Sequence, residues 1–213
     1  MDQPLVKISD LSKYFDKDKR CAIEKLDLEF TEGKIIGLIG PDGAGKTTLI
    51  RIMAGLLKPN TGNVTILGND TIKEPEKVHQ LIGYMPQRFG LYEDLSVIQN
   101  LTLYSDIFNL SEEDKKERFE ILLKFTNLKN FTERLAGKLS GGMKQKLGLA
   151  CTLLRKPRFL ILDEPSVGVD PISRKELWEM VSQLKEDNIS ILWSTSYLDE
   201  AEKCQEVIVL NEG

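Results

Sequence analysis

The chain has 213 residues, of which 29% are charged and 41% are hydrophobic, and its formal net charge is −4. This composition is ordinary for a globular protein with one large domain or two lobes. The acidic balance argues against nucleic acid as a partner, because phosphate binding requires a basic surface. No apolar run reaches membrane-spanning length and no signal peptide is visible. The three cysteines are isolated, with neither metal-ligand spacing nor a disulfide framework, which suits a reducing cytoplasm.

The first third of the chain indicates short strands. Apolar residues predict strands at 5–9, 22–30, 35–39, 63–68 and within 78–85. In the second of these, Leu26, Leu28 and Phe30 alternate with acidic residues, which is typical of a half-buried strand. The charged stretch 13–20 predicts a loop between the first two strands.

The middle of the chain predicts helices. Helix starts are indicated by Ser96 with Gln99, Ser111 with Asp114, and Asp170 with Pro171. Strands return at 158–162, 189–193 and 206–210. We therefore predict a helical lobe at 89–156, inserted into an α/β core formed by 1–88 and 157–213.

One stretch fits the phosphate-binding pattern G-x-x-x-x-G-K-[ST], with an apolar strand before it and a helix after it: Gly40, Pro41, Asp42, Gly43, Ala44, Gly45, Lys46, Thr47 and Thr48. Its glycines let backbone N–H groups approach a polyphosphate, and the helix directs its positive end to the same place. We expect Lys46 to reach the β- and γ-phosphates and Thr47 to offer its hydroxyl to Mg²⁺. A glycine turn that binds nothing is the alternative.

Two acids, Asp163 and Glu164, end the apolar strand at 158–162. Beside a phosphate-binding loop, the first acid is expected to hold Mg²⁺. The second is expected to orient and deprotonate an attacking water. Taken alone, the pair fits equally well two acids that cap a turn.

A Ser-Gly-Gly turn at Ser140, Gly141 and Gly142 opens a further predicted helix. Its free N–H groups and the serine hydroxyl form a second potential anion site. Because a nucleotide has one γ-phosphate, which the first loop already binds, the second site indicates action on a nucleotide held by another domain. The alternative is a Ser-Gly helix start without a ligand.

Together the motifs at 40–48, 139–145 and 159–164 resemble those of the ATP-binding domain of ABC transporters, and the resemblance covers the whole chain. The flanking stretches 83–87 and 91–95 are similar to the bacterial drug-efflux branch, in particular to the first half of a tandem two-domain exporter ATPase. The resemblance implies a single α/β domain over 1–213: a P-loop NTPase core, an N-terminal antiparallel β subdomain and an inserted helical lobe.

Several roles follow from the resemblance alone. Gln87 is expected to touch Mg²⁺ and the transport subunit, and Asp170 to lie in a loop that communicates across a dimer. Phe15, or alternatively Tyr14, is expected to stack on adenine. The resemblance implies ATP and Mg²⁺ as cofactors, and as partners a second ABC ATP-binding domain (a second copy or a tandem paralogous half) and an integral membrane permease. It places the protein at the cytoplasmic face of the inner membrane.

The sequence departs from the family at two positions. Ser196 occupies the place of a histidine that contacts the γ-phosphate, and His79 lies too early in the chain to replace it. Serine donates a hydrogen bond but lacks the charge and reach of imidazole, so we expect slow hydrolysis with ATP binding retained. Asp42 replaces a more common asparagine and is expected to weaken nucleotide binding slightly.

Two other functions stay open from the sequence. One is a nucleotide-binding regulatory half with negligible turnover, which Ser196 favours and Glu164 opposes. The other is a soluble ABC protein that acts away from membranes, although the sequence lacks the zinc sites and basic linkers expected there. Because the chain stops at Gly213 directly after a predicted strand, we expect it to be part of a longer protein.

Overall fold

The structure is a computed structural model and describes residues 4–15 and 20–211. The chain forms two compact units. The first comprises the described residues of Met1–Tyr84, Pro157–Glu164 and Lys185–Gly213, and the second comprises Met85–Lys156 and Pro165–Leu184.

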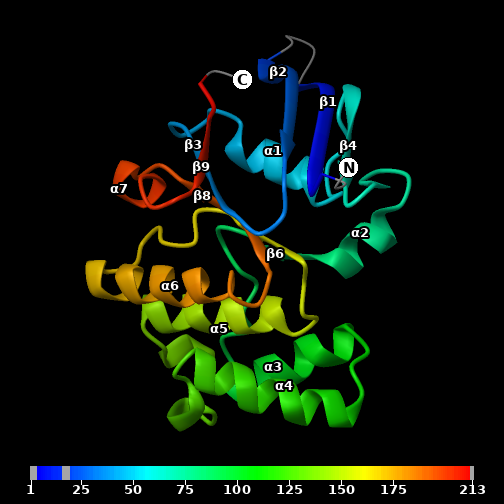
Figure 1. Cartoon of the computed structure of the whole chain (residues 1–213). Coiled ribbons are helices and arrows are strands. Elements are labelled where there is room, and N and C mark those ends of the chain that lie inside the picture. The colour runs from blue at the N-terminus through cyan, green and yellow to red at the C-terminus, as the bar shows by residue number, and fades with distance from the viewer. Residues whose placement is uncertain (1–3, 16–19, 212–213) are drawn as a thin grey trace. The chain divides into compact units, whose positions relative to one another are not determined.

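An antiparallel sheet opens the first unit (Figure 1). Its strands, in the order β2-β1-β4-β5 within the described residues, are β1 (Val6–Phe15), β2 (Arg20–Phe30), β4 (Thr61–Ile66) and β5 (Asn69–Asp70). In β2, Leu26 and Leu28 are half-buried and Phe30 is buried, so the alternating pattern is confirmed. The predicted loop at 13–20 is wrong in part, because β1 continues to Phe15; residues 16–19 lie outside the described residues.

A second sheet has the strand order β6-β7-β8-β3-β9 in the part of the chain that the structure describes. Its strands are β3 (Ile35–Ile39), β6 (Ile82–Met85), β7 (Phe159–Leu162), β8 (Ser190–Thr195) and β9 (Glu206–Val209). The pairs β7–β8, β8–β3 and β3–β9 are parallel. Every residue of β7 and β8 is buried, which is typical of strands inside a parallel sheet that is covered on both faces.

Helix α1 (Lys46–Met53) shares one hydrophobic core with strands of both sheets. Leu49, Ile50, Ile52 and Met53 are all buried, while Arg51 is exposed, so the helix has one wide apolar face toward the core. The predicted strand within 78–85 is wrong in its first half, which forms helix α2 (Pro75–Leu81) before β6 begins. A short helix, α7 (Leu198–Ala201), follows β8.

The second unit is helical. It contains α3 (Val97–Ile107), α4 (Glu112–Phe125), 3₁₀ turns at Lys129–Phe131 and Ala136–Lys138, α5 (Gly141–Leu153) and α6 (Pro171–Gln183). The predicted helix starts are confirmed. Ser96 and Gln99 form a capping box, and Ser111 and Asp170 accept hydrogen bonds from the backbone N–H three residues on.

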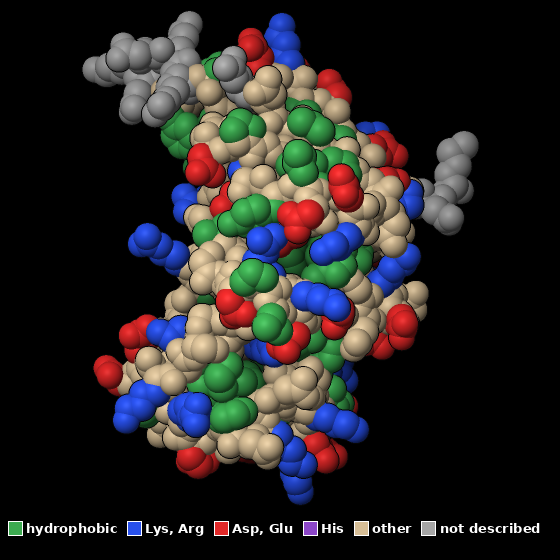
Figure 2. Space-filling model, turned by 90° about the vertical axis from the view of Figure 1, so that its left-hand side faces the viewer, with side chains coloured by type: hydrophobic (Ala, Val, Ile, Leu, Met, Phe, Trp, Pro, Cys, Tyr) green, Lys and Arg blue, Asp and Glu red, His purple; other side chains and the backbone are tan. Residues whose placement is uncertain are grey.

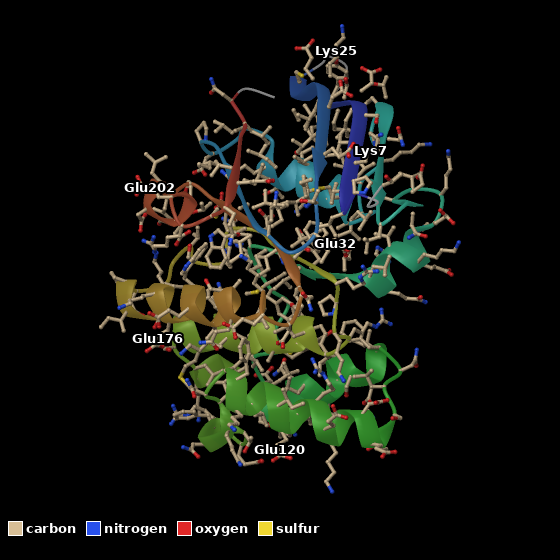
Figure 3. All side chains as sticks on the ribbon, viewed as in Figure 1. Lys7, Lys25, Glu32, Glu120, Glu176 and Glu202 are labelled. Atoms are coloured by element: carbon tan, nitrogen blue, oxygen red, sulfur yellow. The ribbon has the colours of Figure 1, made fainter. Side chains whose placement is uncertain are left out.

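Helix α6 belongs to this second unit, whereas the sequence placed it with the α/β core. It lies along α5 (Figure 1), and Glu176 on α6, labelled in Figure 3, pairs with Lys146 of α5 at 2.6 Å. A Cβ atom on Gly142 would lie 2.5 Å from Ser173, so the glycine permits the close approach of the two helices.

The surface mixes charges of both signs. On the face in Figure 2, Lys and Arg side chains are interspersed with Asp and Glu. None of the helices built from the described residues has the length and apolar character needed to span a membrane.

Candidate nucleotide-binding site

The loop from Gly40 to Thr48 joins the carboxyl end of β3 to α1 and is shaped by backbone contacts. A Cβ atom on Gly40 would lie 2.4 Å from the Leu210 carbonyl oxygen, and one on Gly45 would lie 2.3 Å from the Ala22 carbonyl oxygen. Gly45 also has a φ of 102°, a backbone conformation that residues with a side chain rarely adopt. Among the described residues no side chain caps α1, so the N–H groups of its first turn can bind an anion.

The side chain of Lys46 turns back over this loop. Its Nζ donates to the carbonyl oxygens of Gly40 (2.7 Å) and Pro41 (3.2 Å) and pairs with Glu164 Oε1 at 2.9 Å. Lys46 is 4% exposed and Glu164 is 7% exposed, so this is a buried ion pair. The arrangement places a cation directly above the phosphate-binding turn. Pro41 and Asp42 are exposed on the outer side of the loop, while Thr47 and Thr48 are half-buried.

The carboxylate of Asp163 meets Thr47 across the site. Its Oδ1 accepts hydrogen bonds from Thr47 Oγ1 (3.2 Å) and Ser194 Oγ (3.0 Å). Its Oδ2 is buried and has no hydrogen-bond partner among the described residues. Burial raises the pKa of Asp163, and the two hydroxyl hydrogen bonds oppose that rise.

These residues fit Mg²⁺. Mg²⁺ prefers oxygen ligands and is usually held by one or two carboxylates together with substrate phosphates. The unpartnered Asp163 Oδ2 and the adjacent Thr47 hydroxyl supply such oxygens beside the phosphate-binding loop. The same unpartnered atom is costly in a buried position unless something binds it.

Glu164 follows in an unusual backbone conformation. Its φ is 50°, in the left-handed region that is rare for residues other than glycine. Its N–H donates to Ser194 Oγ at 2.8 Å. The strained turn directs the Glu164 side chain back to Lys46, away from the path of a continuing strand.

Ser194 is the residue that sequence reasoning missed. It contacts both acids, yet in the sequence it is one of several hydroxyl residues that follow the apolar run at 191–193. The strand register identifies it, and that register is known only from the structure. Trp193 is paired with Leu162 and Thr195 with Ile39, so a polar residue between them must lie among the ends of three parallel strands.

Ser196 begins the exposed turn after β8. Because Thr195 is paired with Ile39, Ser196 and Gly40 follow neighbouring strand ends at the same edge of the sheet. Buried Glu200 accepts hydrogen bonds from Thr195 Oγ1 (2.6 Å) and Trp193 Nε1 (3.0 Å), which fixes the start of this turn. His79 has another use, since its Nε2 lies 2.9 Å from the Ala54 carbonyl oxygen at the end of α1.

The two candidate aromatic residues lie at the end of β1. Tyr14 is paired with Cys21 on β2, next to the Ala22 carbonyl that faces Gly45. Phe15 is 38% exposed, and the ammonium group of Lys13 lies 5.2 Å from its ring centroid. Both stay candidates for adenine stacking.

The other predicted site residues lie in the second unit. Gln87 is exposed in the bend after β6. Ser140 caps α5 by accepting the Met143 N–H at 3.3 Å, and Asp170 caps α6 by accepting the Ser173 N–H at 3.0 Å. The latter bond lowers the pKa of Asp170. A close helix contact explains Gly142 without a ligand, whereas a Cβ on Gly141 would lie at 3.4 Å from the nearest atom.

Comparisons with known proteins agree with this geometry. A family model described as ABC transporter matches residues 23–167. The chain is 56% identical over its whole length to a probable multidrug ABC transporter ATP-binding protein, YbhF, of Escherichia coli (strain K12), and covers 37% of it. It is 35% identical over 98% of its length to the doxorubicin resistance ATP-binding protein DrrA of Mycobacterium tuberculosis (strain ATCC 25618 / H37Rv), and covers 63% of it. The chain therefore spans less than two thirds of either relative.

Among solved structures, the chain resembles the dimeric structure of a post-hydrolysis state of the ATP-binding cassette MJ0796 bound to ADP and Pi. The TM-score is 0.87 and the sequence identity 26%, over 98% of this chain and 95% of that chain. The predicted fold class is confirmed by this match and by the two sheets described above.

Proposed function

Because this chain belongs to the ABC transporter family, we propose that it is the ATP-binding and ATP-hydrolysing part of a membrane exporter of the drug-efflux type. The observation that carries the proposal is the convergence of Lys46, Thr47, Asp163 and Glu164 at the carboxyl ends of β3 and β7. Ligands of open α/β sheets bind at this edge. The names of the relatives, which refer to multidrug transport and doxorubicin resistance, support the efflux class.

In the proposed reaction, water and ATP give ADP and phosphate. The N–H groups of the loop and Lys46 Nζ bind the β- and γ-phosphates. Glu164 accepts a proton from the attacking water as its oxygen bonds to the γ-phosphorus and the bond to the bridging oxygen breaks. Mg²⁺, bound with ATP, would neutralise phosphate charge, and Thr47 and Asp163 would hold it. Phe15 or Tyr14 would stack on the adenine.

We further propose that a second ATP-binding domain completes the site. The start of α5, with exposed Ser140 and Gly141, would bind the γ-phosphate held by a partner domain, and the Asp170 loop would lie at the same interface. The partner is a second copy or a tandem paralogous half. An integral membrane permease would hold the assembly at the cytoplasmic face of the inner membrane.

Equilibrium binding and turnover test the proposal. A fluorescent ATP analogue is titrated into the chain with Mg²⁺, and phosphate release is followed with ATP. Lys46→Ala should weaken binding or turnover at least about tenfold, because it removes the cation at the phosphates. Lys34→Ala is the control, because Lys34 also pairs with an acid, Glu206, at the other end of β3. If Lys46→Ala and Lys34→Ala bind the analogue and release phosphate equally well, the proposed ATP site at Lys46 is rejected.

Slow turnover at the chain's own site is a separate part of the proposal and rests on exposed Ser196. Ser196→His should raise turnover in the paired assembly by about tenfold or more, because imidazole adds reach and charge at the γ-phosphate. ATP affinity should change little. No rise in turnover, with ATP binding unchanged, would reject the slow-site proposal. The second candidate is a regulatory half, and a paired wild type that binds ATP in a single-turnover measurement and does not cleave it would favour that candidate.

A further inference from the structure

Ser194 lies among the ends of three parallel strands and is completely buried. It is paired with Leu38 on β3, and it follows Trp193, which is paired with Leu162 on β7. The two acids of the proposed site come directly after Leu162. Ser194 is therefore held by its register between the strand that leads into the phosphate-binding loop and the strand that carries the acids.

The Ser194 hydroxyl donates a hydrogen bond to one acid and accepts a hydrogen bond from the other. It donates to Asp163 Oδ1 at 3.0 Å and accepts the Glu164 N–H at 2.8 Å. A hydroxyl group has one hydrogen to donate and lone pairs to accept, so the two bonds are compatible. One buried side chain thus fixes the carboxylate of the first acid and the backbone of the second.

We propose that Ser194 is a positioning residue of the ATP site, which acts through Asp163 and Glu164 and does not touch the nucleotide. With Thr47 it holds Oδ1 of Asp163, which leaves the unpartnered Oδ2 available to Mg²⁺. By accepting the Glu164 N–H, it supports the left-handed conformation that brings the Glu164 carboxylate to Lys46. This inference rests on the proposed function.

The chain offers a matched control on the same strand. Ser190 begins β8, is also completely buried, and accepts the Gly33 N–H at 2.8 Å. Ser190→Ala and Ser194→Ala therefore each remove one buried hydroxyl that accepts a backbone N–H at the same distance. Ser194→Ala also removes the hydrogen bond that Ser194 donates to Asp163, so it should lose more stability than Ser190→Ala in urea denaturation, and only Ser194 lies at the acids.

The experiment compares the wild type with both alanine variants. Phosphate release measures kcat and KM, and a fluorescent ADP analogue measures nucleotide binding in EDTA and during a Mg²⁺ titration. Ser194→Ala should lower kcat by about 10- to 100-fold, because losing a residue that orients a metal ligand commonly has an effect of this size. The Mg²⁺ concentration that gives half of the maximal change in nucleotide binding should rise by about the same factor. Binding in EDTA should stay within about threefold of the wild type, because the phosphate-binding loop is intact. Ser190→Ala should match the wild type in every assay.

A second pair of variants separates the hydroxyl from the volume of the side chain. Ser194→Thr keeps the hydroxyl and Ser194→Val replaces it with a methyl group of nearly the same size. The threonine variant should retain activity and Mg²⁺ dependence close to wild type, whereas the valine variant should behave like Ser194→Ala. This pair decides the question if Ser194→Ala does not fold.

The proposal is overturned if Ser194→Ala matches Ser190→Ala in kcat and in Mg²⁺ dependence, or if threonine performs no better than valine. In both cases an active wild type leaves the proposed ATPase function standing. A wild type that neither binds the analogue nor releases phosphate contradicts the proposed function itself.

Discussion

At the scale of single residues, the site is a compact set of opposed charges and hydroxyl groups. Lys46 and Glu164 form a buried ion pair, and Asp163 keeps one buried oxygen without a partner among the described residues. Buried charge that is incompletely paired lowers stability, and functional sites commonly carry this cost. Asp163 is therefore expected to be a residue without which the fold would be more stable.

Glu164→Gln tests the role of the second acid. An amide cannot accept the proton of the attacking water, so turnover should fall by about 10²- to 10⁴-fold. ATP binding should be retained, because the change removes a negative charge near the phosphates. Turnover assays and titration of the fluorescent ATP analogue check both outcomes. Glu206→Gln, which removes the acid that pairs with Lys34, is the control and should leave turnover unchanged.

Asp163→Asn tests the cost of the buried carboxylate. Since the pKa of Asp163 is raised in the folded state, the folded chain binds this proton up to a higher pH than the unfolded chain does. Ionisation then opposes folding, so the stability contributed by Asp163 falls as pH rises from the usual carboxyl range, near about 4, through the folded pKa.

The variant should therefore increase the free energy of unfolding by about 1 kcal/mol at neutral pH, with the increase disappearing as pH falls toward about 4. Urea denaturation in EDTA over a series of pH values measures this. Asp187→Asn, on an exposed stretch before β8, is the control. A gain that is independent of pH would show that Asp163 carries no raised pKa.

At the scale of elements, two turns that begin helices depend on glycine for different reasons. Gly45 precedes α1 with a positive φ and with the Ala22 carbonyl oxygen against it, while Gly142 lies against α6. Gly43 also has a positive φ, of 83°, but a Cβ atom added there would have no other atom within 4 Å. Steric overlap and backbone strain can therefore be separated by comparing these positions.

Gly45→Ala should reduce the free energy of unfolding by about 3 kcal/mol or more, because it adds overlap at 2.3 Å to the left-handed strain. Gly43→Ala should reduce the free energy of unfolding by only about 1 kcal/mol, because it adds backbone strain without steric overlap. Urea denaturation of both variants measures the difference. Equal losses would mean that the contact with β2 does not constrain the loop.

Gly142→Ala should destabilise the second unit by about 1–3 kcal/mol, because the new methyl group would overlap Ser173 at 2.5 Å. Gly141→Ala, one residue earlier, meets its nearest neighbour at 3.4 Å and should be nearly neutral. Denaturation followed by circular dichroism distinguishes the two. Adding Ser173→Gly should restore much of the loss in Gly142→Ala.

The elements also show where sequence reasoning succeeded. The apolar runs of β3, β7 and β8, and the caps Ser96, Ser111 and Asp170, are local signals, and the structure confirms them. Helix α2 was missed because it has seven residues and only Val78 is buried, so it has almost no apolar periodicity. Ser194 and the grouping of α6 with α5 depend on strand register and helix packing, which link distant parts of the chain.

At the scale of the whole molecule, the proposed site residues divide between the two units. The phosphate-binding loop, Asp163 and Glu164 lie in the first unit, and Gln87, Ser140 and Asp170 lie in the second. The start of α5 is exposed, as a surface that serves a partner's nucleotide must be. Binding of ATP and its cleavage should therefore respond differently to changes in the two units.

Ser140→Arg should lower turnover by about 100-fold without changing ATP affinity, because it places a bulky side chain where a partner's phosphate would bind. Ser111→Arg is a matched control. Ser111 is likewise an exposed serine that caps a helix, and it accepts the Asp114 N–H at 3.1 Å. Both variants should lose the same small amount of stability. Equal turnover in the two variants would contradict a role for Ser140 in a shared site.

A single-turnover measurement tests the central claim most directly, namely that the loop at 40–48 and the two acids form a site that cleaves ATP. The chain, paired with its second ATP-binding domain, in excess and with Mg²⁺, is mixed with labelled ATP, and ADP and phosphate are followed over time for the wild type and Lys46→Ala. We predict that the wild type converts the bound ATP to ADP and that Lys46→Ala does not. Wild-type ATP that remains bound and uncleaved, or cleavage at the same rate in both proteins, would contradict the account.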